Sequence, residues 1–285
     1  MGDAWINEAL DYLVPCAAGM FIWAKTAANF LQEDTASRFY ILKTWKQEDR
    51  AEVFKDLYSL YSTVNKTSFQ NISKQKVEAI ISVMGAMIFA KQPLDNDALI
   101  TLPGVRNPGS DLDMLEFIRK GLVSVIDSGS VLHFHHRSFE DFLSDFFRNH
   151  LPNLSGVQDR NLHEHQLAML CLNVMISPKL HFNMCNLVSS SIKNVDITDK
   201  SAISPLISYS SQFWEDHLVQ TQGEEALTTA VEFVIYEKLL FWIEVMSILE
   251  KAHEAHAILK RVLEWPALAV CSEFVSCNTT LRLAD

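Results

Sequence analysis

Residues 131–147 read Val131-Leu-His-Phe-His-His-Arg-Ser-Phe-Glu-Asp-Phe-Leu-Ser-Asp-Phe-Phe147, and their hydrophobic pattern changes in the middle. The first five residues, up to His135, favour a strand. Beyond them the apolar side chains recur at helical spacing and mark one face: Phe139, Phe142, Leu143, Phe146 and Phe147. Ser138 and Asp141 fit a Ser-x-x-Asp helix start, so we expect the Ser138 side chain to cap this helix.

The residues upstream of this stretch extend the pattern. Leu122–Ile126 predicts a second strand, and Asp127–Ser130 predicts a tight turn in which Gly129 is free to take a positive φ. Before them, Ser110–Lys120 is predicted to be a helix that Gly121 ends. Helix, strand, turn, strand and helix in this order predict a winged helix.

Composition favours a helical protein. Of the 285 residues, 48% are hydrophobic, and only 9 Gly and 8 Pro are present, which disfavours a β-sandwich with many turns. The net charge of −11 counts against nucleic-acid binding, because an acidic surface repels phosphate backbones. The longest apolar runs, Leu13–Ala24 and Ala79–Ala90, are too short to span a bilayer. The five scattered cysteines suit a reducing compartment, so we expect a cytoplasmic protein without membrane contact.

The chain divides into three parts, and the fold class is mainly α. We expect a helical domain over residues 1–70, a winged-helix domain with a small β-hairpin over 71–150, and a second helical domain over 151–285. Two helix starts are expected where Asp95 and Ser204 cap the following residues. The last domain contains a predicted helix at Ala226–Leu249 that carries Phe233, Tyr236, Leu240, Phe241, Val245 and Leu249.

Four passages resemble one protein family. They are Gly19–Ala27, Leu57–Tyr61, His135–Leu143 and Ile203–Leu218. In this order they resemble the region that follows the nucleotide-binding core in fungal NACHT-type signalling NTPases, which belong to the NLR-like STAND class. The resemblance implies two helices of a small helical domain, the last helix of a winged-helix domain, and a helical segment further downstream.

The resemblance also implies a role for one residue, His136. In the family, a histidine at the start of this helix faces the nucleotide and touches the β-phosphate in the resting, ADP-bound state. His136 stands two residues before Ser138, where the family pattern has that histidine. The alternative is a histidine that merely ends a strand.

The phosphate-binding loop of the family is missing from the sequence. No Gly-Lys dipeptide occurs, so there is no Gly-x-x-x-x-Gly-Lys-Ser/Thr motif, and no acidic strand that could hold magnesium precedes Gly19. We therefore expect a non-catalytic regulatory and hinge arm whose partner is a NACHT-type NTPase core, in cis or in trans. No cofactor is expected in the isolated chain, and ADP or ATP is expected only with an upstream core. The alternatives are a nucleic-acid-binding winged helix and a helical scaffold unrelated to nucleotide signalling.

Other chemistry receives little support from the sequence. His133, His135 and His136 have no cysteine or carboxylate near them at a zinc-binding spacing, so we expect no metal site. Ser138 stands near these histidines, but no Gly-x-Ser-x-Gly motif surrounds it, and a helix cap would explain it. We expect no catalytic residue.

Overall fold

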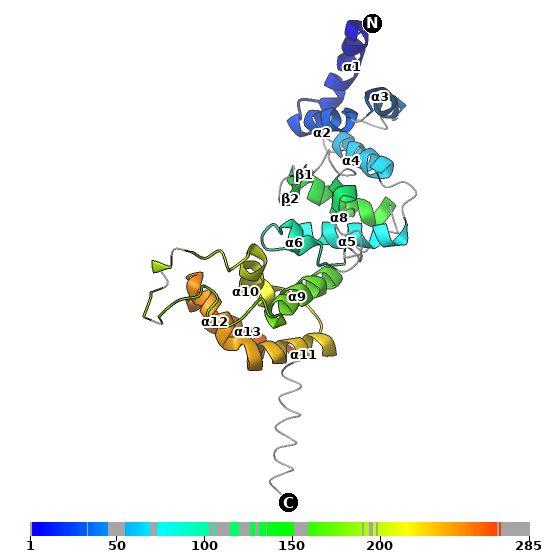
Figure 1. Cartoon of the computed structure of the whole chain (residues 1–285). Coiled ribbons are helices and arrows are strands. Elements are labelled where there is room, and N and C mark those ends of the chain that lie inside the picture. Colours follow the sequence, from blue (N-terminus) through cyan, green and yellow to red (C-terminus); the bar gives the residue numbers. More distant parts are fainter. Residues whose placement is uncertain are drawn as a thin grey trace, which may run out of the picture. The chain divides into compact units, whose positions relative to one another are not determined.

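The protein is mainly helical (Figure 1). The structure, a computed structural model, describes the following residues: 2–32, 34–44, 55–68, 73–102, 105, 115–119, 126–128, 131–134, 136–150, 159–189, 191–193, 196–197, 199–266 and 268. Among these residues, no helix has both the length and the apolar character needed to cross a membrane.

The chain forms two compact units. The first comprises Met1–Ile88 and Gly104–Gln158, and the second comprises Phe89–Pro103 and Asp159–Asp285. Residues 89–103 thus group with the C-terminal part. The predicted separation of residues 1–70 from residues 71–150 stays a prediction.

Helix α2 is the centre of the N-terminal helices. The first unit begins with α1 (Gly2–Ala17), α2 (Phe21–Leu31), α3 (Thr35–Thr44) and α4 (Lys55–Ser68). Helix α2 contacts each of the other three, and it buries Trp23, Ala27 and Phe30 at helical spacing. The chain turns between α1 and α2 at Gly19, which has a φ of +78° that glycine adopts without steric cost.

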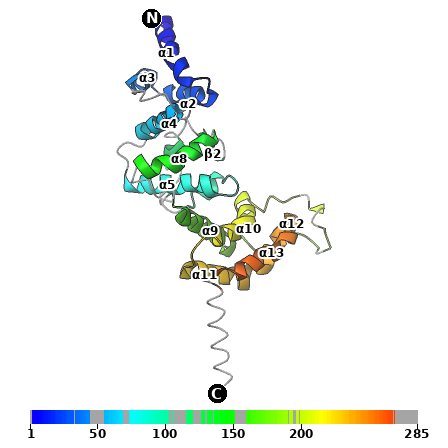
Figure 2. The ribbon, with the colours of Figure 1, turned by 180° about the vertical axis from the view of Figure 1, so that it is seen from behind.

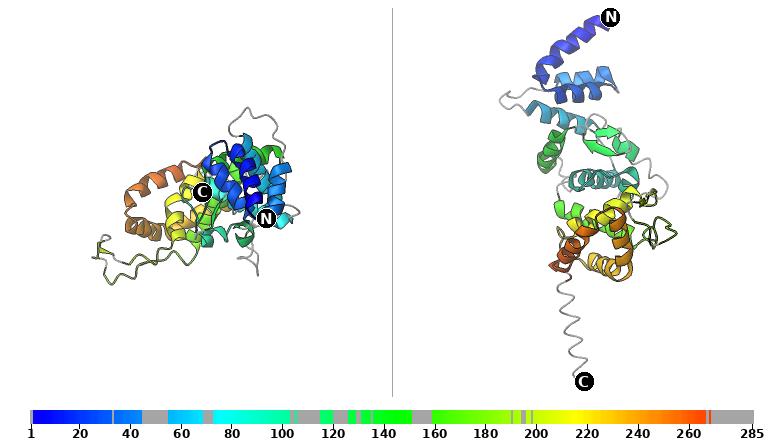
Figure 3. Two further views of the ribbon diagram at one scale, coloured as in Figure 1. Left: turned by 90° about the horizontal axis from the view of Figure 1, so that it is seen from above. Right: turned by 90° about the vertical axis from the view of Figure 1, so that its left-hand side faces the viewer.

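Two short paired strands come before α8 in the sequence. Strand β1 (Ile126–Ser128) pairs antiparallel with β2 (Leu132–Phe134), and the two strands are drawn as arrows in Figure 3. In this pairing Asp127 lies opposite His133. The predicted turn began at Asp127, but Asp127 and Ser128 belong to the strand. Residues 122–125, 129–130 and 135 lie outside the described residues. Of the predicted helix Ser110–Lys120, residues 115–119 are helical, and its other residues lie outside the described ranges.

Helix α8 (Arg137–His150) carries the aromatic core of the first unit, and it lies alongside α4 (Figure 2). Phe139, Phe142 and Leu143 are at most 2% exposed, as the sequence predicted. The side chains of Phe146 and Phe147 lie outside the described residues. From α4, Tyr61 packs its ring 4.9 Å from Phe139 and 5.3 Å from Phe142, measured between centroids. Apolar stripes on the two helices therefore face each other.

Seven further α-helices have bounds that the structure gives, and two of them begin at a predicted cap. They are α5 (Lys74–Phe89), α6 (Asn96–Leu99), α9 (Arg160–Ile176), α10 (Pro205–Leu218), α11 (Glu225–Phe233), α12 (Leu239–Ile248) and α13 (Ala252–Leu263). The side chains of Asp95 and Ser204 accept backbone N–H groups at the starts of α6 and α10, which confirms both predicted caps. In the second unit, α9 packs along α10, and α10 also contacts α12 and α13.

The predicted helix Ala226–Leu249 is interrupted. A π-helical turn, η3 (Val234–Lys238), separates α11 from α12. Trp242 and Val245 are fully buried, whereas Phe233, Tyr236 and Leu240 are exposed. The wider turn adds a residue and rotates the side chains that follow, so a regular helical period does not describe the buried face.

Candidate functional site

His136 stands directly before α8 and is exposed. Its carbonyl oxygen accepts the N–H of Phe139 at 3.0 Å, and its ring Nδ1 accepts the N–H of Ser138 at 3.1 Å. The imidazole therefore caps the first turn of α8. The predicted Ser138 cap is wrong, because the helix begins at Arg137 and Ser138 already lies within it.

The Ser138 hydroxyl joins His136 to the interior. Ser138 is only 6% exposed, and its Oγ lies 2.8 Å from Nδ1 of His136 and 2.9 Å from the hydroxyl oxygen of Tyr61 on α4. Burial raises the pKa of Tyr61, while hydrogen bonds with Ser138 and Thr26 act in the opposite direction. An exposed imidazole is thus connected through one serine to a buried phenol.

Aromatic packing fixes the inner end of this connection. The Tyr61 ring is 1% exposed and lies against Phe139 and Phe142. Phe139 also contacts Phe134 of β2, with ring centroids 5.4 Å apart. Since interior side chains are close-packed, the Tyr61 hydroxyl has little freedom to leave Ser138.

A hydroxyl this close to an imidazole resembles a nucleophile and its base. The Ser138 oxygen, however, is buried and already bonded to Tyr61, so an incoming carbonyl would meet no open face. Ser138 is therefore better suited to hold the exposed His136 in place by a hydrogen bond than to act as a nucleophile.

The opening stretch contains two further histidines. His133 is exposed on β2, and His135 lies outside the described residues. Within the ranges that the structure describes, no three His, Cys, Asp or Glu side chains are arranged to hold a metal ion.

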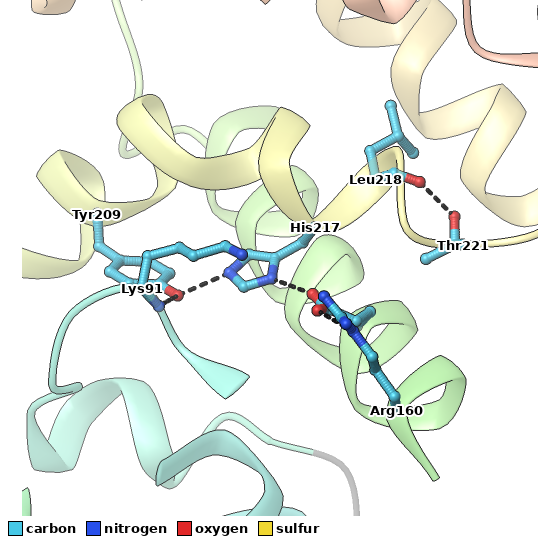
Figure 4. A network of polar contacts seen from close by, with 7 residues as sticks. Lys91, Arg160, Tyr209, His217, Leu218 and Thr221 are labelled. Atoms are coloured by element: carbon cyan, nitrogen blue, oxygen red, sulfur yellow. Dashed lines mark hydrogen bonds and ion pairs between the residues drawn. The ribbon is translucent and has the colours of Figure 1, made fainter. Parts of the chain in front are cut away.

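The second unit contains a buried polar network that the sequence analysis missed (Figure 4). His217 of α10 lies between two partners: its Nδ1 is 2.6 Å from Oε2 of Glu164 on α9, and its Nε2 is 2.7 Å from the Tyr209 hydroxyl. The Tyr209 oxygen also accepts the backbone N–H of Lys91 at 3.2 Å. Both ring nitrogens of His217 therefore have a hydrogen-bond partner inside the second unit.

Charge in this network is concentrated on Glu164, which is 1% exposed. Burial by itself raises the pKa of this carboxyl group. The hydrogen bond and charge of His217, the charge of Lys91 and a hydrogen bond from Arg160 outweigh that effect and hold the pKa below its ordinary value. The Nε of Arg160 lies 3.2 Å from Oε1 of Glu164. Burial raises the pKa of Tyr209, so this phenol remains protonated.

The network connects three segments of the second unit. It joins the residues after α5 to α10 through Lys91 and Tyr209, and it joins α10 to α9 through His217 and Glu164. A cavity of about 190 Å³ lies beside Tyr209, between residues 92–98 and the first turn of α10.

One signal in the sequence could have revealed Glu164. It precedes Leu167 and Cys171 by three and seven residues, so it lies on the same helical face as these buried side chains. A carboxylate on an apolar face indicates a buried partner. Nothing local identified that partner as His217, which is 53 residues away.

Comparisons of the chain with known protein families, curated proteins and solved structures found no match.

Proposed function

We propose that the chain is a non-catalytic regulatory arm of a NACHT-type signalling protein of the STAND class. In this proposal a helical domain precedes a winged-helix domain, a second helical domain follows, and the arm acts in the cytoplasm through protein contacts. One observation carries the proposal. An exposed imidazole, His136, is held at the start of α8, where the family that the sequence resembles has its nucleotide-facing histidine.

The helices agree with the passages that carry the resemblance. Gly19–Ala27 leads into α2, Leu57–Tyr61 lies within α4, and Ile203–Leu218 ends with α10. His135–Leu143 covers the start of α8. These agreements support the proposal at the level of helix positions.

A partner must supply the nucleotide. The sequence contains no Gly-Lys dipeptide, so the phosphate-binding loop would belong to a NACHT-type NTPase core in cis or in trans. A regulatory arm responds to nucleotide only if it binds the ADP state and the ATP state with different affinity. His136 would provide that difference by donating a hydrogen bond to the β-phosphate of ADP.

The test measures binding of the purified chain to a fungal NACHT-type NTPase core loaded with ADP or with a non-hydrolysable ATP analogue. We expect tighter binding to the ADP form. His136→Ala should weaken binding to this form by about one to two orders of magnitude, because a hydrogen bond to a charged group is lost. The matched control is His256→Ala, which removes an exposed histidine from α13. Equal affinity for both nucleotide states, or an ADP-state affinity unchanged by His136→Ala, would contradict the proposal.

The same protein should be tested against duplex DNA. The described side chains near the start of α8 include the acidic Glu140 and Asp141 beside Arg137, which favours protein contacts over phosphate contacts. A strongly salt-dependent gel shift would favour the nucleic-acid-binding alternative instead.

A further inference from the structure

We propose that Ser138 and Tyr61 are positioning residues that set the tautomer of His136, so that its exposed Nε2 always carries the proton. The chemical partner of such an N–H is an anionic oxygen. That this oxygen belongs to a nucleotide phosphate rests on the proposed function, whereas the tautomer follows from the contacts within the first unit.

The direction of each hydrogen bond follows from one backbone group. The N–H of Ser138 can only donate, and it lies 3.1 Å from Nδ1 of His136. Nδ1 must therefore present its lone pair, and the proton of the neutral ring resides on Nε2.

The Ser138 hydroxyl then has a single possible orientation. It lies 2.8 Å from the same Nδ1, so its hydrogen must point to that nitrogen. Having donated its only hydrogen, Ser138 Oγ must accept from the Tyr61 hydroxyl, 2.9 Å away. The chain of donors thus runs from Tyr61 through Ser138 to His136.

In this series of hydrogen bonds the inner residue, Tyr61, is fixed by packing, and the outer residue, His136, is accessible. Tyr61 is 1% exposed within the aromatic core, and its hydroxyl also has a hydrogen bond with Thr26 of α2. At the other end His136 is exposed, and Nε2 has no partner among the residues that the structure describes. Packing of α2, α4 and α8 therefore determines which imidazole nitrogen an external group meets.

The ring nitrogen that carries the proton decides what His136 can bind. An Nε2–H donates to a phosphate oxygen, whereas a ring protonated at Nδ1 alone would present a lone pair to it. The opposite tautomer would also place the Nδ1 hydrogen against the N–H of Ser138 and remove the cap of α8.

The experiment measures the tautomer directly. The chain is labelled with ¹⁵N-histidine, the two ring nitrogens are read by long-range ¹H–¹⁵N NMR near pH 8, and the His136 signals are identified by their loss in His136→Gln. We expect Nδ1 as acceptor and Nε2 as N–H. Ser138→Ala should lower the ratio of Nε2–H to Nδ1–H tautomer about two- to tenfold, since one hydrogen bond to Nδ1 is lost. Ser138→Thr keeps the hydroxyl and should restore the ratio.

Tyr61→Phe provides the second variant. It keeps the ring in the core and removes the donor to Ser138, so it should shift the tautomer ratio in the same direction by a smaller factor. A proton on Nδ1 in the unmodified chain, or a ratio that neither Ser138→Ala nor Tyr61→Phe changes, would overturn the inference.

A binding measurement separates this inference from the proposed function. With the ADP-loaded NTPase core, Ser138→Ala should weaken binding and Ser138→Thr should restore it, in parallel with the tautomer ratio. If the tautomer responds as expected but His136→Ala leaves binding unchanged, the proposed function fails and the positioning role stands. If His136→Ala weakens binding but neither Ser138→Ala nor Tyr61→Phe changes the tautomer ratio, the positioning role fails.

Discussion

Phe142 occupies the centre of the contact between α8 and α4. It is 2% exposed, and its ring lies 5.3 Å from Tyr61 and 5.4 Å from Tyr58. Replacing it with alanine leaves a cavity that neighbouring rings cannot fill, so Phe142→Ala should destabilise the first unit by about 3–5 kcal/mol. Hydrogen exchange followed by mass spectrometry should then show protected amides of α4 and α8 exchanging about two to four orders of magnitude faster.

Phe21 provides the control for this change. It is 81% exposed at the start of α2, in the same unit. Phe21→Ala should change stability by no more than about 0.5 kcal/mol. Equal exchange rates in the two variants would show that Phe142 does not fill the core as its exposure indicates.

Glu164 should make the second unit sensitive to acid. Its pKa in the folded protein lies below the ordinary 4.5, so the unfolded chain binds the proton more readily. The stabilisation by ionised Glu164 is complete above the pKa that this residue has in the unfolded chain. It is lost as the pH falls through the lower pKa that the residue has in the folded protein. The Glu164→Gln variant has no titratable group at this position. Its urea unfolding midpoint, measured by tryptophan fluorescence, should therefore fall less between about pH 5 and pH 3 than the midpoint of the unmodified chain.

Glu225→Gln is the matched control, because Glu225 is exposed on α11. It should retain the acid dependence of the unmodified chain. An unchanged acid dependence in Glu164→Gln would contradict the lowered pKa.

At the scale of elements, charged side chains of η3 and α12 hold the connection between α9 and α10. Glu244 accepts the N–H groups of Asn183 and Met184, both at 3.0 Å. Lys238 donates to the carbonyl oxygens of Ser177 and Leu180. These contacts give backbone groups of an irregular segment the partners that a helix or sheet would supply.

Glu244→Ala should release this segment without unfolding the helices around it. Amides in residues 177–189 should exchange faster by about one to two orders of magnitude, because two hydrogen bonds to a carboxylate are lost. Amides of α10 should keep their rates. Exchange that rises equally in α10 would mean that the segment is part of the core of the unit and not a separately anchored connection.

At the scale of the whole molecule, the 285-residue chain should neither bind nor hydrolyse ATP. The physical reason is the missing Gly-Lys loop, whose backbone N–H groups and lysine hold the phosphates in NTPases that contain it. Calorimetry with ATP and magnesium, together with a phosphate-release assay, measures both properties. Turnover well above background that a point mutation in this chain abolishes would refute the expectation.

The sequence was sufficient for features that depend on neighbouring residues. The stripe on α8, the caps at Asp95 and Ser204, and the mainly helical character follow from spacing and composition, because these act within a few turns of the chain. The same local reasoning failed at Ser138. Which residue caps α8 depends on where the backbone enters the helix, and starts one or two residues apart differ little in local free energy.

Other features required the packed molecule. Tyr61 and Ser138 are 77 residues apart, and Glu164 and His217 are 53 apart, so no local pattern predicts that either pair meets. The π-helical turn before α12 likewise exposes Tyr236 and buries Trp242, against the regular period. Tertiary packing decides these features because burial of a polar group is tolerated only where helices bring its hydrogen-bond partner within reach.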